Sequence, residues 1–252
     1  MKHRLLILAA SCLLSTSALA ANGDWSGWYV GIHAGHSSGD ADARASLGGQ
    51  WSVESQALRD FVADGWSTGF DPSDSTYGLQ FGVLHQFANG FVLGGELDHS
   101  QLHFEESRST GPQPATPFPS LTYDFGNAID VDSKMSLRAR FGYASGQHLF
   151  YLTGGVARVD ADVVATIESN GNYLKRGVAS ETLDATEFGA GYEYDFGNQW
   201  SLRAEYLRTD ADDFSYDTAY VAGSSFVTPA YTETFRQSLE FDSFRIGLSY
   251  RF

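Results

Sequence analysis

The feature that most constrains this chain is a regular alternation of tight turns and long connections between segments of period-two patterning. Eight such segments, each about nine to twelve residues long, have the length that a tilted strand needs to cross a bilayer. They are 28–36, 77–87, 91–101, 134–143, 148–159, 186–196, 200–209 and 244–252. Tight turns at Asn89-Gly90, Gly146 and Gly197-Asn198 alternate with the long connections 37–76, 102–133, 160–185 and 210–243. Transmembrane β-barrels alternate in this way, whereas most loops of soluble domains have about four to six residues.

Each segment has one face that is apolar enough to meet lipid. In the last segment Phe244, Ile246 and Leu248 alternate with Arg245 and small residues. We therefore predict an all-β fold, an eight-stranded antiparallel up-and-down transmembrane β-barrel with four long extracellular loops. In the segment 148–159 two assignments stay open, because Leu149 and Tyr151 or Phe150 and Leu152 fit the outward face equally well.

Composition narrows the class of protein further. After the N-terminal residues no apolar stretch approaches 18 residues, which excludes helical membrane spans. The net charge of −15 argues against nucleic acid as a partner, because its phosphates are bound by Lys and Arg. A soluble β-sandwich remains the alternative, and its apolar face would be the core of the sandwich instead of a lipid contact.

The first residues have the pattern of a secretory signal peptide. A basic start precedes the apolar run 5–14, and small residues at positions 18 and 20 favour cleavage after Ala20. We therefore divide the chain into a signal peptide, 1–20, and an outer-membrane β-barrel domain, 21–252. The single cysteine, Cys12, lies in the signal peptide, so the mature chain is expected to form no disulfide.

Several stretches resemble the alphaproteobacterial porin-family outer-membrane proteins, which include major surface antigens. The similar stretches are Trp-Ser-Gly-Trp-Tyr-Val-Gly-Ile-His-Ala-Gly at 25–35, Ser-Leu-Arg-Ala-Arg-Phe-Gly-Tyr at 136–143, Leu-Thr-Gly-Gly-Val-Ala at 152–157, Ser-Leu-Arg-Ala-Glu-Tyr at 201–206 and Arg-Ile-Gly-Leu-Ser-Tyr-Arg-Phe at 245–252. The resemblance covers the strands and not the long connections. It implies a barrel like the transmembrane domain of outer-membrane protein A, without that protein's peptidoglycan-binding domain, as a multi-pass protein of a Gram-negative outer membrane.

The same resemblance implies insertion by the barrel-assembly machinery. The expected signal is the alternating aromatic end of the last strand, Leu248, Tyr250 and Phe252. Aromatic residues also gather at the short-turn ends of the segments, where amphipathic rings favour the membrane interface. This predicted aromatic girdle consists of Trp28, Phe87, Phe91, Tyr143, Phe196 and Trp200.

The inward faces carry five acids and five bases. They are Glu96, Asp98, Lys134, Arg138, Arg140, Glu187, Glu193, Arg203, Glu205 and Arg245. Buried charges persist only when they are paired, and an eight-stranded barrel is just wide enough for side chains to fill it. We expect these residues to form a salt-bridged plug. The alternative is a gated, narrow ion path in which the pairs exchange partners.

No catalytic residue, metal site or cofactor is predicted, and the chain is not expected to be an enzyme. Glu96 and Asp98 have arginines beside them, which favours ion pairing over acid–base catalysis. His99 with Ser100, or His103 with a nearby acid, is the weak basis for a distant alternative, an outer-membrane lipid hydrolase. The histidines are otherwise scattered, so haem or metal capture has little support.

The long connections are acidic, which is typical of a solvated surface. The sharper hypothesis is that divalent cations bridge these acids to lipopolysaccharide. Apolar residues at helical spacing predict a short helix over 53–63 that caps the barrel. The expected role is envelope structure and surface interaction; the alternative is a narrow porin for small solutes or ions. The expected partners are outer-membrane lipid and lipopolysaccharide, with an unidentified extracellular ligand at the loops.

Overall fold

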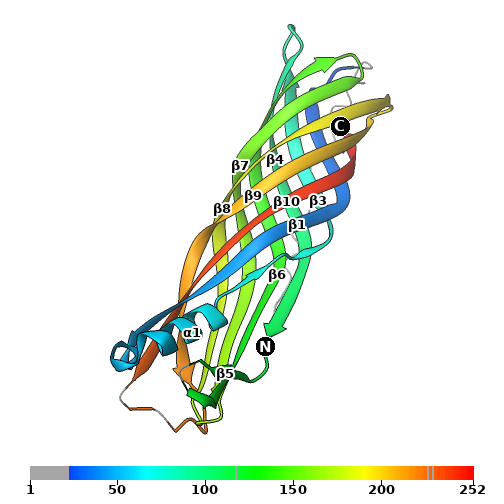
Figure 1. The fold of residues 1–252 in the computed structure, drawn as a ribbon. Helices are drawn as coiled ribbons and strands as arrows, with labels where there is room; N and C mark the ends of the chain where they lie inside the picture. Colours follow the sequence, from blue (N-terminus) through cyan, green and yellow to red (C-terminus); the bar gives the residue numbers. More distant parts are fainter. Residues whose placement is uncertain (1–22, 117, 226, 229) are drawn as a thin grey trace.

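The computed structural model describes residues 23–116, 118–225, 227–228 and 230–252. Eight long antiparallel strands form a closed, tilted barrel (Figure 1). They are β1 (Gly27–Gly49), β3 (Ser73–Gln86), β4 (Phe91–Ser109), β6 (Phe118–Ser145), β7 (His148–Ser169), β8 (Leu174–Gly197), β9 (Trp200–Tyr220) and β10 (Tyr231–Arg251). Each strand pairs with the next long strand in the chain, and β10 pairs with β1 to close the ring. The predicted eight-stranded up-and-down barrel is therefore confirmed.

Shorter elements accompany the long strands. The 3₁₀-helix η1 (Gln50–Val53), the helix α1 (Gln56–Trp66) and the strand β5 (Gln113–Ala115) lie at one end of the barrel, and the strand β2 (Thr68–Phe70) pairs with Ala41–Ala43 of β1. The opposite end holds the three tight turns, where Gly90 has a φ of 87° and Gly146 a φ of 59°. These positive φ values explain why the turns contain glycine.

The prediction of four long loops is wrong in extent, because the strands continue through most of those residues. β6, for example, has 28 residues and includes all of 118–133, which is half of the connection 102–133 that we predicted as a loop. The reason is an inversion of polarity along each strand. Near the turns the apolar residues face outward, whereas farther along the same strands they face inward. We call these two parts the apolar band and the outer half.

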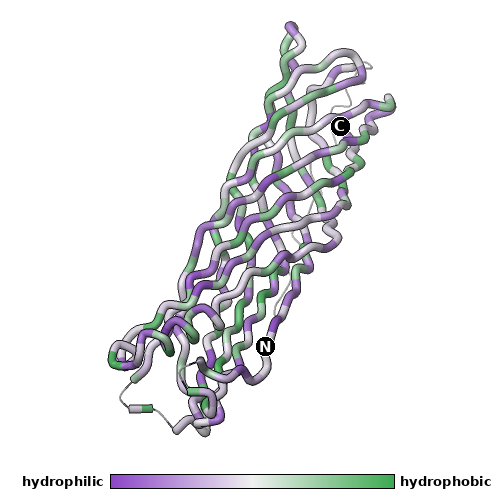
Figure 2. Tube along the Cα trace, in the orientation of Figure 1, coloured by the Kyte–Doolittle hydropathy of each residue, from purple (hydrophilic) through white to green (hydrophobic). Residues whose placement is uncertain are grey.

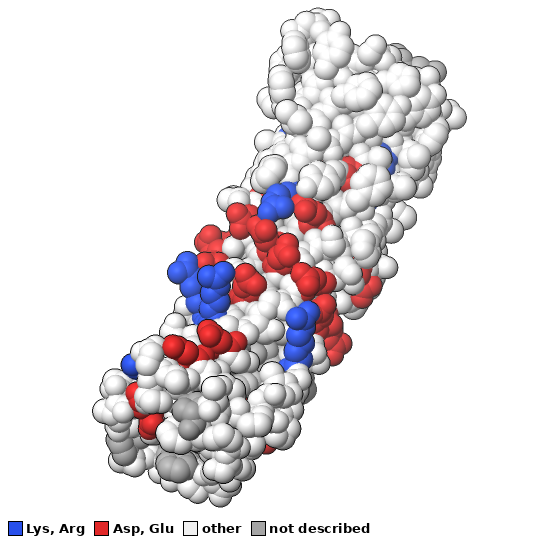
Figure 3. All heavy atoms as spheres, viewed as in Figure 1, with Lys and Arg blue, Asp and Glu red and all other residues white. Residues whose placement is uncertain are grey.

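β7 shows the inversion clearly. In the apolar band Phe150 and Leu152 are 59 % and 64 % exposed, which settles the open assignment of this strand. In the outer half Val159 and Val163 are buried, while Asp160 between them is exposed. Figure 3 shows the change on one face of the barrel: charged side chains gather over its middle, next to a region nearly free of them.

β-Bulges mark the boundary between the two parts on some strands. In the part of β6 next to the tight turn, from Ala144 back to Lys134, the even-numbered residues face inward. From Val131 toward the start of the strand, the odd-numbered residues do so. The register of β6 on β7 shifts at this point, where Asp132 is the extra residue. A bulge changes the face on which later side chains lie. This one directs Val131 and Ile129 into the interior of the outer half.

Helix α1 covers the interior of the outer half. Ser55 caps its N-terminus by accepting a hydrogen bond from the backbone N–H of Leu58, and Leu58, Val62 and Trp66 are buried. The Trp66 ring packs edge-on against Phe235, with 4.9 Å between the ring centroids. The predicted helix over 53–63 is thus present as a helix that begins three residues later. Figure 2 shows apolar residues on strands at this end of the barrel.

Candidate functional site

The ten charged residues predicted for the interior all lie there, on β4, β6, β8, β9 and β10. Each is almost completely buried in the apolar band. Alternation along the strands explains their common direction, because every second side chain of a strand points into the barrel. Their charges balance, with five carboxylates and five cationic groups.

Glu96 on β4 is the centre of this charge network. Its carboxylate pairs with Arg138 of the neighbouring strand and with Arg203 of β9, and it accepts a hydrogen bond of 2.5 Å from the Tyr29 hydroxyl. In the ring, β9 lies four strands from β4 in either direction. The ion pair between Glu96 and Arg203 therefore crosses the full diameter of the barrel.

The other pairs extend the network along the barrel axis. Arg245 contacts Asp98 at 2.9 Å and Glu205 at 2.6 Å. Arg138 also contacts Glu187 at 2.7 Å, and Glu187 pairs with Lys134. Toward the turns, Arg140 contacts Glu193 at 2.7 Å.

Some members of the network were not predicted. The rings of Tyr29 and Tyr151 flank Arg140, whose guanidinium carbon lies 3.8 Å from the Tyr151 ring centroid. Arg251 pairs with Asp195 at 2.6 Å near the turns. Tyr29, Asp195 and Arg251 have the inward parity of their strands, which was the available signal, whereas the parity of Tyr151 was left open by the sequence. We overlooked the tyrosines because aromatic residues were assigned to the lipid face.

His33 is a second residue that the sequence reasoning missed. Its ring lies 3.1 Å from Ser100 Oγ and 3.4 Å from an Asp98 oxygen, an arrangement that superficially resembles a Ser–His–Asp triad. The three side chains are buried among Gln80 and Arg245, within the charge network. Burial of this kind leaves no room for a substrate at Ser100. The sequence had suggested His99 as the partner of Ser100, but His99 lies on the outward face.

The predicted aromatic girdle lies on the outside, close to the tight turns. Its six members, Trp28, Phe87, Phe91, Tyr143, Phe196 and Trp200, are between 41 % and 53 % exposed. Trp200 packs against Tyr250 with 5.2 Å between the ring centroids, and Phe91 packs against Tyr143 with 5.7 Å between them. At the end of the last strand, Leu248 and Phe252 face outward as well.

A second buried charge cluster lies at the far end of the outer half. Glu233 pairs with Lys175 and accepts hydrogen bonds from the indole of Trp51, at 2.6 Å, and from Tyr173 and Thr218. Sequence analysis placed Glu233 in a solvated acidic loop. That interpretation is wrong, because Glu233 is only 1 % exposed. Its alternation with buried Phe235 was the signal for an inward direction.

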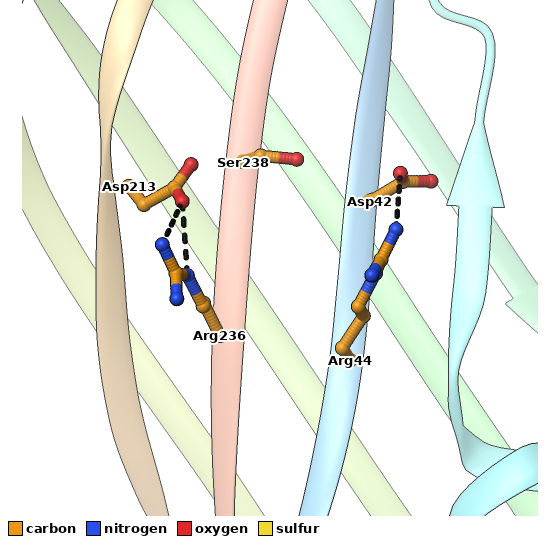
Figure 4. Close-up of a pocket in the computed structure, with 5 residues that line it drawn as sticks. All are labelled: Asp42, Arg44, Asp213, Arg236 and Ser238. Atoms are coloured by element: carbon orange, nitrogen blue, oxygen red, sulfur yellow. Dashed lines mark hydrogen bonds and ion pairs between the residues drawn. The ribbon is translucent and has the colours of Figure 1, made fainter.

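The outer surface carries a shallow hollow of about 370 Å³ at the closing strands β1 and β10. Figure 4 shows its lining: Arg44 beside Asp42, and Arg236 beside Asp213. The two arginines lie directly opposite each other in the β1–β10 register, and each has its own acidic partner. These are exposed ion pairs, which contribute little to stability or binding.

No other chemistry stands out in the described residues. Among them, no group of three or more His, Asp or Glu side chains is placed to hold a metal ion. None of their helices is both long and apolar enough to span a membrane. The signal peptide predicted over 1–20, including Cys12, lies outside the described residues.

The closed barrel, its apolar band and its charged interior define an integral β-barrel of the Gram-negative outer membrane. A family model described as an outer membrane protein beta-barrel domain matches residues 6–252. The chain belongs to this family, as the resemblance implied.

Two relatives and two solved structures support the assignment. The 31 kDa outer-membrane immunogenic proteins of Brucella melitensis and Brucella suis are each 27 % identical over 239 residues, which are 94 % of this chain and 88 % of theirs. The outer membrane protease OmpT of Escherichia coli is similar in structure, with a TM-score of 0.50 and 9 % identity over 90 % of this chain and 97 % of that one. Outer membrane protein OprG of Pseudomonas aeruginosa has the same TM-score and 13 % identity, over 92 % and 98 %. At these identities the two structures share the fold alone.

Proposed function

We propose that this protein is a non-conducting surface barrel, whose membrane part is an anchor and whose outer half presents a binding surface outside the cell. The observation that carries the proposal is the ion pair between Glu96 and Arg203, which crosses the diameter of the barrel. A pair that spans the ring blocks the path that a solute would follow along the axis. Both side chains are buried, and removing one partner of a buried ion pair costs about 3–5 kcal/mol, so the pair resists being opened.

Apolar layers on both sides of the charge network also support a barrel that does not conduct. Toward the turns, Trp25, Leu84 and Leu149 belong to a buried cluster. In the outer half, Trp66 and Phe125 belong to a much larger one. Water and ions avoid apolar layers of this kind, since they find no hydrogen-bond partners there.

The relatives support the proposed surface role. They are described as outer-membrane immunogenic proteins. An antigen has to be reached from outside, and an outer half with charged exterior strands is suited to that exposure. The relatives' description also agrees with a role other than catalysis, although a protease shares the fold.

Lipid and lipopolysaccharide are the partners that we propose for the membrane part. The exposed apolar side chains of the band, such as Ile32, Leu137 and Ile246, support a lipid contact. Exposed carboxylates lie directly beyond the band on several strands, among them Asp132 and Asp160. Their position is consistent with cation-bridged contact to lipopolysaccharide. Insertion by the barrel-assembly machinery likewise stays a prediction.

Single-channel recording in planar bilayers tests the proposal against a narrow porin. The purified protein should give no steady conductance above that of the lipid alone. Traces of a contaminating porin are the main complication, so Arg203→Gln and, independently, Lys134→Gln are recorded beside the wild type. Both substitutions change the charge of the interior.

The outcomes distinguish a closed barrel from a narrow porin. Conductance that is absent, or that is identical in all three proteins and therefore comes from a contaminant, supports the closed barrel. Sustained conductance of the wild type whose ion selectivity changes in either variant would show a path along the interior and overturn the proposal.

A further inference from the structure

A small pocket lies at the outer tip of the barrel, where residues from or next to all four outer connections meet. Its volume is about 200 Å³. The residues that matter for its chemistry are Trp51, Glu54, Phe118, Tyr123, Tyr173 and Tyr231. They come from η1 and its end, from β6, from the hairpin between β7 and β8, and from β10, at the end of the barrel that holds α1 and β5 (Figure 1).

Half of the ten residues that line this tip pocket are aromatic, and two more are leucines. The Trp51 ring packs edge-on against Tyr231 and Tyr173, with 4.9 Å and 5.8 Å between the ring centroids. These contacts hold the three rings in place. Sites for drug-sized ligands usually measure about 300–1,000 Å³. The tip pocket is smaller, which limits its ligand to a compact molecule or to the compact head of a larger one.

One carboxylate gives the pocket its charge. Glu54 accepts a hydrogen bond of 2.6 Å from the Tyr231 hydroxyl. Among the described residues no lysine, arginine or histidine forms an ion pair with Glu54. Burial, and then the charge of Glu54, raise the pKa of Tyr123 to about 12. The phenol is therefore neutral at physiological pH, and the negative charge at the pocket is left without a cation of the chain.

The layer beneath the pocket already holds a cation by this chemistry. The Lys175 ammonium lies 4.6 Å from the Tyr220 ring centroid and pairs with Glu233. It also donates a hydrogen bond of 2.7 Å to the backbone carbonyl of Tyr231, a residue that lines the pocket. Aromatic faces and a carboxylate thus bind an alkylammonium group inside this same tip.

We propose that the tip pocket binds a small organic cation, an ammonium group with apolar substituents, through its aromatic walls and the carboxylate of Glu54. Aromatic cages recognise quaternary ammonium groups in this way, because the ring faces are electrostatically negative. A neutral ligand would use only the apolar walls, and an anion would be repelled by Glu54. The inference rests on the proposed surface role only in that the pocket faces the outside.

Isothermal titration calorimetry on the full chain tests this site. The protein is refolded in an uncharged polyoxyethylene detergent, since detergents with choline-like heads would compete. Choline is titrated first, followed by 3,3-dimethylbutan-1-ol, which has the same shape without the charge. We expect choline to bind and the neutral alcohol to bind at least ten-fold more weakly.

Two substitutions with the same change of charge locate the site. Glu54→Gln should weaken choline binding at least ten-fold. Asp60→Asn, on the exposed face of α1 and away from the pocket lining, should leave it unchanged. Tyr123→Leu, which removes an aromatic wall, provides an independent second variant and should also weaken binding. Retained heat-modifiable migration on a gel shows that each variant is folded.

Three results would overturn the proposal: no binding of choline at 50 mM, equal binding of the neutral alcohol, or equal weakening by Glu54→Gln and Asp60→Asn. None of them bears on the proposed closed barrel, because conductance is measured separately. Conversely, a conducting barrel would leave the calorimetric result intact.

Discussion

Removing the charge of Glu96 is the sharpest test of how the barrel interior is held together. Glu96→Gln keeps the size of the side chain and its ability to accept hydrogen bonds. It leaves five cationic groups against four carboxylates among side chains that are almost completely buried. Arg203 would then lose the carboxylate with which it pairs, and Arg138 would lose the closest of its carboxylate partners.

The expected cost follows from that loss. Breaking a buried ion pair by removing one partner typically destabilises a protein by about 3–5 kcal/mol. A matched control is Asp184→Asn, which breaks the pair between Arg158 and Asp184 on the outer surface. Those two side chains are 73 % and 74 % exposed, and exposed pairs contribute about 0–1 kcal/mol.

Equilibrium unfolding in urea, on protein inserted into phospholipid vesicles, measures both values. Tryptophan fluorescence and the mobility of the folded form on a gel serve as independent probes. The double variant Glu96→Gln/Arg203→Gln restores the charge balance and should recover part of the loss, since residues in contact couple by about 0.5–3 kcal/mol. The reasoning fails if Glu96→Gln costs no more than Asp184→Asn, or if the double variant costs the sum of its two single changes.

Two further predictions concern the outer half. Asp130 lies directly opposite Glu105 on one neighbouring strand and Asp162 on the other. Burial, then the charge of Asp132 and then those of these two carboxylates raise the pKa of Asp130. A raised pKa in the folded state means that the ionised acid destabilises the fold above that pKa and ceases to do so as the pH falls through it. Asp130→Asn should therefore stabilise the protein by about 0.2–1 kcal/mol at pH 8 and by less at pH 4. Urea unfolding at both pH values measures this gain. Asp160→Asn removes a hydrogen-bonded carboxylate and is a control that we expect to destabilise the protein. A gain from Asp130→Asn that is as large at pH 4 as at pH 8 would contradict the argument. Trp66 is 0 % exposed, so Trp66→Ala should cost about 3–5 kcal/mol of unfolding free energy. It should lower hydrogen-exchange protection in the outer half and leave that of the apolar band unchanged. An equal loss of protection along all strands would show that the two parts are not separable.

Most of the membrane part could be predicted from the sequence. In the last strand Phe244 and Ile246 alternate with Arg245 over a segment of bilayer length. This pattern determines which face of the strand meets lipid, and the tight turns determine the register of the strands that they join. All ten interior charges share the inward parity for the same reason. The partners across the lumen were beyond this reasoning. Glu193 and Arg203 are neighbours in the register of β8 and β9, yet Arg203 pairs with Glu96 on the opposite wall.

The outer half was misread for a physical reason. Acidic residues such as Asp160 and Asp162 were interpreted as a loop, because polar residues were expected only inside a membrane barrel. Above the membrane the solvent on the outside is water, so the same strand needs polar residues outside and apolar ones, such as Val163, inside. A bulge such as that at Asp132 changes the parity, and no single-strand pattern predicts its position.

The inversion of polarity also fixes how deeply the protein sits in its membrane. Sinking the barrel by a few residues would pull carboxylates among acyl chains, and raising it would strip lipid from rows of leucine and phenylalanine. The reach of the tip is fixed with it. The roughly 14 residues of β6 from Phe118 to Val131 rise about 3.3 Å each at a tilt near 40°, and so lift the tip about 35 Å clear of the hydrocarbon. If the tip faces the medium, as we propose, a molecule arriving from outside meets this protein well above the lipid headgroups, at a height that its strands leave no freedom to adjust.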